Sequence, residues 1–125
     1  MPILSKPNYN ELMKEGCTKI QGTIVCTGSV LARACVINNI SQADEIQQGD
    51  ILITHSTDIC WSPYFPLLSG LVTELGGLIS HGAVVAREYG LPCIVGAKGA
   101  TQVFQTGDTV LLSGDIGVLQ MIKRT

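Results

Sequence analysis

Residues 76–90, which read GGLISHGAVVAREYG, place one histidine directly behind a pair of glycines and at the start of a run with helical character. The apolar segment LVTE before them is typical of a buried strand. Glycines allow positive φ angles and close approach of the backbone, and a helix N-terminus offers unpaired N–H groups with about half a unit of positive charge. This strand, turn and helix therefore predict an anion site that suits phosphate. The residues expected to bind phosphate are Gly76, Gly77, Ser80 and Gly82.

His81 is the candidate nucleophile of this site. The positive end of the helix dipole disfavours a cationic imidazole, so we expect a neutral ring with one nitrogen free to attack. A phosphoryl group on that nitrogen would lie beside the N–H groups of the first turn, and Gly82 would leave room next to the ring. The alternative is that His81 is an ordinary capping or surface residue and the glycines mark only a turn. The phosphate-loop patterns G-x-x-x-x-G-K-[ST] and G-x-G-x-x-G are absent from the sequence.

The helix that follows the glycine pair has clear end signals. Ser80 is a favourable N-cap, Gly90 stands where a left-handed C-terminal residue belongs, and Pro92 prevents continuation. Between these ends, Arg87 and Glu88 are expected to face outward. The expected apolar body of the helix consists of Ala83, Val84, Val85, Ala86 and Tyr89.

Short apolar segments cut by glycine predict strands over much of the remaining chain. They are GTIVCTG, VLARACVI, DILIT, LVTE, CIVG, TVLLSG and GVLQMI, of which the last two would form a hairpin. One helical turn is expected in QADEIQQ and another in GATQVFQTGD. The segment STDICWSPYFPLLSG contains two prolines and is expected to be a loop with one short helical piece. The pattern predicts an α/β domain with helices on one side of a sheet and further β structure on the other. Residues 1–19 are expected to be a linker or lead-in, and residues 20–125 one domain without an internal repeat.

Composition and charge exclude several classes of function. With 46% hydrophobic and 14% charged residues the chain is not disordered, and a formal net charge of -2 without a basic run excludes nucleic acid as a partner. No apolar run approaches the ~20 residues of a membrane-spanning helix. Because signal-peptide features are also missing, we expect a cytoplasmic protein. The five cysteines form no C-x-x-C pair, so we expect no metal site and predict buried, reduced thiols.

The segment TELGGLISHGAVVAREYGLPCIVG resembles the signature of the phosphohistidine, or swivelling, domain of phosphoenolpyruvate-utilising enzymes. In that family a Gly-Gly pair, three intervening residues, a phosphorylated histidine and a V-A-R-E-x-G-x-P run recur. The likeness covers roughly residues 20 to 122 and includes the stretch STDICWSPYFPLLSGLVTE upstream. The chain looks closest to the rifampin phosphotransferase and phosphoenolpyruvate synthase branch. Ile79 and Gly82 favour the former, because synthases commonly have Thr and Ala there. The matching positions are Gly76, Gly77, His81, Gly82, Ala86, Arg87, Glu88, Gly90, Pro92 and Gly96.

The resemblance implies a three-layer β/β/α swivelling phosphohistidine domain. It also implies that Nε2 of His81 takes a phosphoryl group at an ATP-grasp nucleotide-binding domain and donates it at an acceptor-substrate domain. No cofactor is expected on this domain alone. ATP and Mg²⁺ are expected on the partner domains, and the isolated domain is expected to have no turnover. The rival hypothesis is a non-catalytic interaction module that keeps the fold. Ile79 favours it, because a Thr hydroxyl at that position is lost unless Ser80 replaces it.

Overall fold

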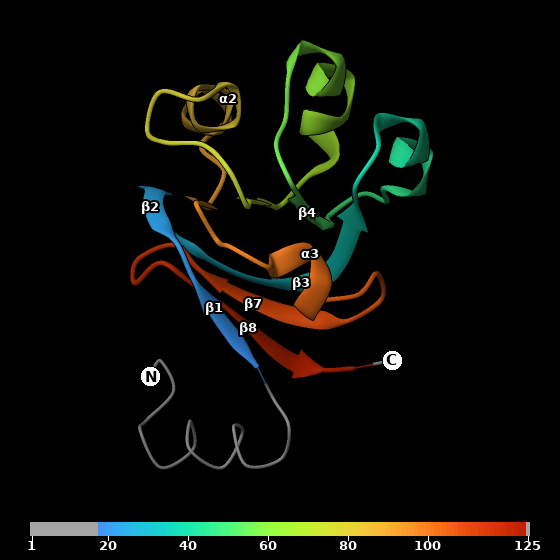
Figure 1. Cartoon of the computed structure of the whole chain (residues 1–125), viewed down its shortest axis with the longest axis vertical. Helices are drawn as coiled ribbons and strands as arrows, with labels where there is room; N and C mark the ends of the chain where they lie inside the picture. Colours follow the sequence, from blue (N-terminus) through green and yellow to red (C-terminus); the bar gives the residue numbers. More distant parts are fainter. Residues whose placement is uncertain (1–17, 125) are drawn as a thin grey trace.

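The computed structural model describes residues 18–124, in which eight strands are joined by short loops and helical segments (Figure 1). Residues 1–17 of the expected linker lie outside the described part of the chain. The strands are β1 (Lys19–Gln21), β2 (Thr23–Cys26), β3 (Ser29–Ile37), β4 (Ile51–Thr54), β5 (Gly70–Thr73), β6 (Cys93–Val95), β7 (Thr109–Ser113) and β8 (Val118–Lys123). The helical segments are the 3₁₀ helices η1 (Ile40–Glu45) and η2 (Ile59–Leu67) and the α-helices α2 (His81–Tyr89) and α3 (Ala100–Val103).

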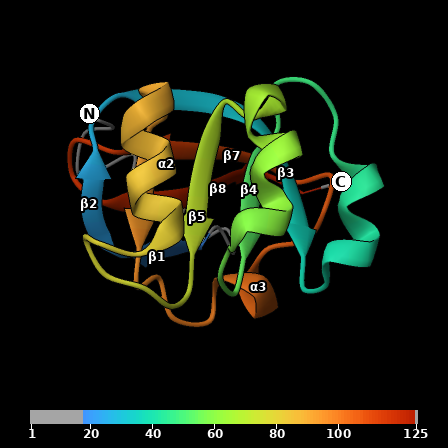
Figure 2. The same cartoon turned by 90° about the horizontal axis from the view of Figure 1, so that it is seen from above.

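The strands follow the spatial order β1-β8-β7-β3-β4-β5-β6-β2, and strand β3 belongs to two layers. Its residues 29–33 pair with β7 in antiparallel orientation, whereas its residues 34–37 pair with β4 in parallel. We call the second half of β3 with β4, β5, β6 and β2 the upper sheet, and the first half with β7, β8 and β1 the lower sheet. Helices η1, η2 and α2 cover the face of the upper sheet that points away from the lower sheet (Figures 1 and 2). The expected three-layer β/β/α arrangement is confirmed.

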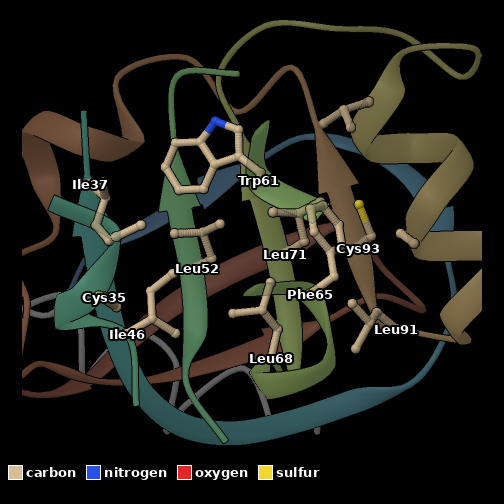
Figure 3. Packing of buried hydrophobic residues seen from close by; sticks show 13 residues of the cluster. Cys35, Ile37, Ile46, Leu52, Trp61, Phe65, Leu68, Leu71, Leu91 and Cys93 are labelled. Atoms are coloured by element: carbon tan, nitrogen blue, oxygen red, sulfur yellow. The ribbon is translucent and has the colours of Figure 1, made fainter. Parts of the chain in front are cut away.

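Two hydrophobic cores lie between the three layers. The side chains of strand β4 point alternately into the two cores. Leu52 packs toward the helices, whereas Ile51 and Ile53 pack toward the lower sheet. On the helical side, the rings of Trp61 and Phe65 from η2 are buried over the upper sheet (Figure 3). The two aromatic rings therefore anchor the loop that leads into β5.

Helix α2 has the expected boundaries and ends at the expected left-handed glycine. Its buried face consists of the small side chains of Ala83 and Ala86, which let the helix axis lie close to the strands. Val84 is 43% exposed, so its expected place in the apolar body is wrong. It lies about 100° further round the helix than Ala83 and points away from the sheet. Tyr89 is half exposed, and its ring contacts that of Phe65 at a centroid distance of 6.1 Å.

Two elements differ from the sequence-based expectation. The expected loop between β4 and β5 contains a nine-residue 3₁₀ helix, η2, in spite of Pro63 and Pro66. It begins at a cap in which the Asp58 carboxylate accepts a backbone N–H two residues further on, and burial of Trp61 and Phe65 stabilises it. Strand β1 was not expected, because three residues of mixed polarity carry no strand pattern. It forms by antiparallel pairing with β8.

One turn occurs twice, although no internal repeat was expected. The sequence Q-x-G-D at residues 47–50 leads into β4, and the same sequence at residues 105–108 leads into β7. In both turns the buried aspartate accepts the backbone N–H of the glutamine, at 2.8 and 2.9 Å. An arginine also donates two hydrogen bonds to each aspartate, Arg33 in the first turn and Arg124 in the second. Each arginine further donates to a carbonyl five residues before its aspartate. Strands β4 and β7, the two neighbours of β3, therefore start from equivalent junctions.

Candidate functional site

The carboxyl ends of the parallel strands β4 and β5 meet the start of α2 at one edge of the upper sheet (Figure 2). The loop after β4 supplies His55 and Thr57, and the loop after β5 runs from residue 74 to the helix. The two loops are tied together, because the N–H of Glu74 and the N–H of Leu75 both donate to the carbonyl of His55. This is the place where an open α/β sheet offers side chains from several loops to a ligand.

The turn before α2 is organised around Ser80. Its hydroxyl donates to the carbonyl of Gly77 at 2.8 Å and accepts the N–H of Ala83 at 3.4 Å, so the expected N-cap is confirmed. Gly76 has a φ of 114°, and a Cβ there would lie 2.9 Å from the Ser80 hydroxyl. A Cβ at Gly77 would meet nothing within 4 Å. The turn therefore requires glycine at the first position of the pair, whereas the second position borders open space.

His81 is half buried at the first position of α2, and its ring is held on two sides. Its Nδ1 lies 3.0 Å from the Oγ1 of Thr57. The ring of Phe65 stands edge-on to it, with centroids 6.0 Å apart and an interplanar angle of 87°. Nε2 has no hydrogen-bond partner within residues 18–124. When the proton is on Nδ1, the Thr57 hydroxyl oxygen accepts a hydrogen bond from Nδ1–H, and Nε2 keeps a lone pair for attack on an electrophile.

Gly82 lies against the residue that orients His81. A Cβ at position 82 would come within 3.0 Å of the Thr57 Oγ1 and 3.2 Å of the Leu71 Cδ2. We expected Gly82 to leave open space beside the imidazole. The Thr57 hydroxyl instead lies next to the position that a Gly82 side chain would take. In the described part of the chain, the backbone N–H groups of His81 and Gly82 have no acceptor. They are the unpaired donors that a helix start offers to an anion.

Thr57 was not singled out from the sequence, although it lies in the stretch STDICWSPYFPLLSGLVTE that carries part of the family resemblance. It lies 24 residues before His81, so its contact with the ring depends on the pairing of β4 with β5. Neither composition nor local spacing contains this information. Ile79, which was singled out, is 91% exposed and has no hydroxyl to offer.

His55 lies at the same edge but belongs to a separate cluster. Its Nδ1 is 3.0 Å from the Glu74 Oε1, and the Glu74 Oε2 accepts two hydrogen bonds from the N–H and the hydroxyl of Thr101. Burial by itself would raise the pKa of Glu74, but the hydrogen bonds from His55 and Thr101 outweigh it and hold that pKa below its usual value. This cluster fastens α3 to the end of β5.

Large apolar side chains are exposed around the site. Ile79 and Leu78 precede His81 in the turn, Leu75 lies at the start of the same loop, and Ile59 opens η2 after Thr57. In residues 18–124, no three His, Cys, Asp or Glu side chains come together as a set that could hold a metal ion. None of the helices in those residues is long and apolar enough to cross a membrane.

The sequence was compared with known protein families and proteins. Residues 46–117 match the family model described as "PEP-utilising enzyme, mobile domain". A rifampicin phosphotransferase of Streptomyces sviceus is 48% identical over 102 residues, which are 82% of this chain and 12% of that protein. A phosphoenolpyruvate synthase of Pseudomonas aeruginosa is 36% identical over 117 residues, which are 86% of this chain and 15% of that protein. The chain thus spans only about an eighth of the length of the curated relatives that it matches.

Solved structures share the fold at lower sequence identity. The solution structure of an Enzyme I fragment has a TM-score of 0.55 and 23% identity, and the match covers 63% of this chain and 33% of that one. Aconitase X of Thermococcus kodakaraensis has a TM-score of 0.66 and 14% identity over 85% of this chain and 99% of that one. At these identities the likeness shows the fold alone.

Proposed function

Because this chain belongs to the mobile-domain family of PEP-utilising enzymes, we propose that it is a phosphoryl-carrier domain and that His81 carries the phosphoryl group. The observation that supports this most is the contact between Nδ1 of His81 and the Thr57 hydroxyl at 3.0 Å. A structural histidine at a helix start would commonly use both nitrogens or cap the helix. Here Ser80 performs the capping, and among residues 18–124 the ring forms a hydrogen bond through Nδ1 only.

The proposed transfer forms a bond between Nε2 and phosphorus and breaks the bond from phosphorus to the leaving oxygen of the donor. In the reactive tautomer the proton is on Nδ1, the Thr57 hydroxyl oxygen accepts the hydrogen bond from Nδ1–H, and Nε2 has the lone pair. A hydroxyl can also donate, so Thr57 can hold the ring in either protonation state of Nδ1 after transfer. The unpaired N–H groups of His81 and Gly82 lie at the positive end of α2, where they stabilise the negative charge of the phosphoryl group that the ring gains.

The roles of the four other expected residues follow from their positions. Gly76 lets the turn form, and Ser80 caps the helix with a hydroxyl proton already donated to the Gly77 carbonyl. Gly77 borders open space, so a phosphoryl group or a partner surface can approach the backbone there. Gly82 allows Thr57 to reach the imidazole. In this proposal Gly76 and Ser80 position the site, while the backbone at Gly77 and Gly82 faces the phosphoryl group.

The donor and the acceptor are proposed to bind to other domains. Phosphoryl transfer needs charge neutralisation by Mg²⁺ or basic side chains. We propose that an ATP-grasp nucleotide-binding domain supplies ATP and Mg²⁺, and that a second domain binds the acceptor. The matched stretch makes up only 12% of each of these relatives, which leaves room in them for both domains. The exposed Ile59, Leu78 and Ile79 would lie against each partner in turn, because they stand in the two loops that hold His81.

Label transfer tests this proposal. The chain would be mixed with the nucleotide-binding domain of its parent enzyme and ATP labelled in its β- and γ-phosphates. We expect one acid-labile, base-stable label per chain, absent from His81→Ala and present in the matched control His55→Ala, which removes the other histidine at the same edge. His81→Ala is expected to fold, because a first-turn position contributes little to packing. An unlabelled native chain, or a labelled His81→Ala variant, would contradict the proposal.

A second candidate function is a non-catalytic interaction module. It is favoured by Ile79, which exposes 91% of its area directly beside the histidine, together with Leu78 and Ile59. The same experiment separates the two functions. An interaction module would bind the nucleotide-binding domain through these residues, so Ile79→Ser would weaken binding, but the bound chain would carry no label.

A further inference from the structure

The edge strand of the upper sheet carries a cysteine directly opposite another cysteine. Strand β2 is the last strand of the order, and among the strands that the structure describes it pairs with β6 alone. In this antiparallel pair, Cys26 is the register partner of Cys93, next to an irregularity in the ladder. Both residues are free cysteines. Residues directly opposite in an antiparallel pair have Cα atoms about 4.5–5.5 Å apart, which is inside the range of about 4.4–6.8 Å that disulfides span.

The two sulfurs also lie on the same face of the sheet. Cys93 is fully buried in the core beneath the helices, and Cys26 packs against that core while remaining partly accessible (Figure 3 for Cys93). Burial raises the pKa of Cys93 to about 12, and the negative charge that the nearby Cys26 thiol can carry adds to this rise. The electrostatic interaction is a second indication that the two thiol groups face each other.

We propose that Cys26 and Cys93 are a redox-active pair that forms a reversible intrachain disulfide with low-molecular-weight disulfides such as oxidised glutathione. The accessible Cys26 thiolate attacks one glutathione sulfur, which forms a mixed disulfide and releases one glutathione thiolate. The Cys93 thiolate then attacks the Cys26 sulfur, which closes the protein disulfide and releases the second glutathione. The two cysteines lose two protons and two electrons, and glutathione disulfide gains them as two thiols. The second step is the slower one, because Cys93 is buried and mostly protonated.

The bridge would fix the edge strand beneath α2. The loop that it closes contains β3, β4, β5 and α2, and α2 packs on both β2 and β6. Cys93 is the first residue of β6, so the bridge lies at the end of the sheet opposite to the carboxyl edge that carries His81. This inference therefore stands whether or not His81 carries a phosphoryl group.

The chain contains its own controls for the test. Trypsin cleaves after Lys19, Arg33, Arg87 and Lys98, so Cys26 and Cys93 fall in peptides 20–33 and 88–98, which contain no other cysteine. The folded protein would be incubated with oxidised glutathione, blocked with iodoacetamide and digested for mass spectrometry. The exposed Cys60 reports how far the oxidant has reacted, since it can only form a glutathione adduct. We expect the linked pair 20–33 with 88–98 in the native chain, and its loss after dithiothreitol.

Variants distinguish a cysteine pair that the fold holds in place from incidental oxidation of separate thiols. Cys93→Ser should leave Cys26 as a stable glutathione adduct, whereas Cys35→Ser, which changes another buried thiol, should still form the bridge. The oxidised native chain should unfold about 5 °C or more above the reduced chain, and Cys26→Ser should show no such shift. The inference fails if Cys60 becomes fully modified while Cys26 stays free or stays as an adduct. It also fails if the linked peptides form only in urea.

Discussion

The Oγ1 of Thr57 lies 3.0 Å from the Nδ1 of His81, so a hydroxyl from the loop after β4 fixes the ring at the start of α2. The contact joins residues 24 positions apart and is possible because β4 and β5 are neighbours in the upper sheet. It occupies Nδ1 and leaves Nε2 as the ring nitrogen without a hydrogen-bond partner among residues 18–124.

Replacing Thr57 by Val removes the acceptor of the Nδ1 proton while keeping the shape of the side chain. The ring then loses the hydrogen bond that orients it, and the rate of label transfer to His81 should fall about 10- to 100-fold. Thr57→Ser keeps the hydroxyl and should recover most of the rate. Equal transfer rates for Val and Ser would mean that the hydrogen bond has no role in transfer.

Replacing Gly82 by Ala should affect transfer more than stability. A Cβ there comes within 3.0 Å of the Thr57 hydroxyl oxygen and pushes it away from the ring. Alanine also favours helix by up to about 1 kcal/mol relative to glycine, which offsets the cost of crowding. We expect a thermal midpoint close to that of the native chain and a several-fold slower label transfer. The double variant with Thr57→Ser, whose smaller side chain can shift, should transfer faster than Gly82→Ala alone.

The two glycines before the helix should respond differently to alanine. Gly76→Ala forces a side chain into a φ of 114° and against Ser80, and should cost about 1–3 kcal/mol of unfolding free energy. Gly77→Ala meets no atom within 4 Å and should change that free energy by less than about 0.5 kcal/mol. Urea unfolding would measure both. If the phosphoryl group lies over the backbone of Gly77 during transfer, Gly77→Ala should still slow label transfer.

Glu74 should make stability depend on pH in the acid range. Because its pKa is lower in the folded chain than the unfolded value of about 4.3, the ionised carboxylate stabilises the fold above that value. This contribution disappears as the pH falls through the folded pKa. Native chain and Glu74→Gln should therefore differ in thermal midpoint at pH 5 and above, and the difference should shrink as the pH falls below about 4.3. Glu88→Gln, on the exposed face of α2, should match the native chain throughout.

The turns that lead into β4 and β7 should contribute similarly to stability. Asp50→Asn leaves Arg33 without its charged partner and weakens the bond to the glutamine N–H, which should cost about 2 kcal/mol or more. Asp108→Asn disturbs the equivalent contacts of Arg124 and should cost a similar amount. Asp44→Asn, an exposed residue of η1, is the control. Urea midpoints that fall for one turn only would show that the two junctions are not energetically equivalent.

Most strands and helix α2 could be predicted from sequence because their signals are local. Alternating apolar residues mark β7, whose Val110 and Leu112 are buried, and Ser80 and Gly90 mark the ends of α2. Helix η2 could not be predicted with its full length, because Pro63 and Pro66 argue against a helix while burial of its own aromatic rings against the upper sheet stabilises it. Strand β1 exists only through its pairing with β8.

For the site, the sequence indicated the histidine and the turn but not the residue that orients the ring. Ser80 as N-cap and Gly76 as a positive-φ residue follow from general preferences at helix starts and turns. Thr57 does not, because its role arises from the packing of two loops that are far apart in the chain. The phosphate-binding roles of Gly76, Gly77, Ser80 and Gly82 and the phosphorylation of His81 stay predictions that the label-transfer experiments address.

Strand β3 also has a mechanical consequence, because its first half pairs in the lower sheet and its second half in the upper sheet. Sliding one layer over the other would break the ladder on one half of this strand. The two layers are therefore joined through β3 and should move as one body. A displacement of the lower sheet would be passed through β3 to its neighbour β4, and so to the loop after β4 that contacts the imidazole.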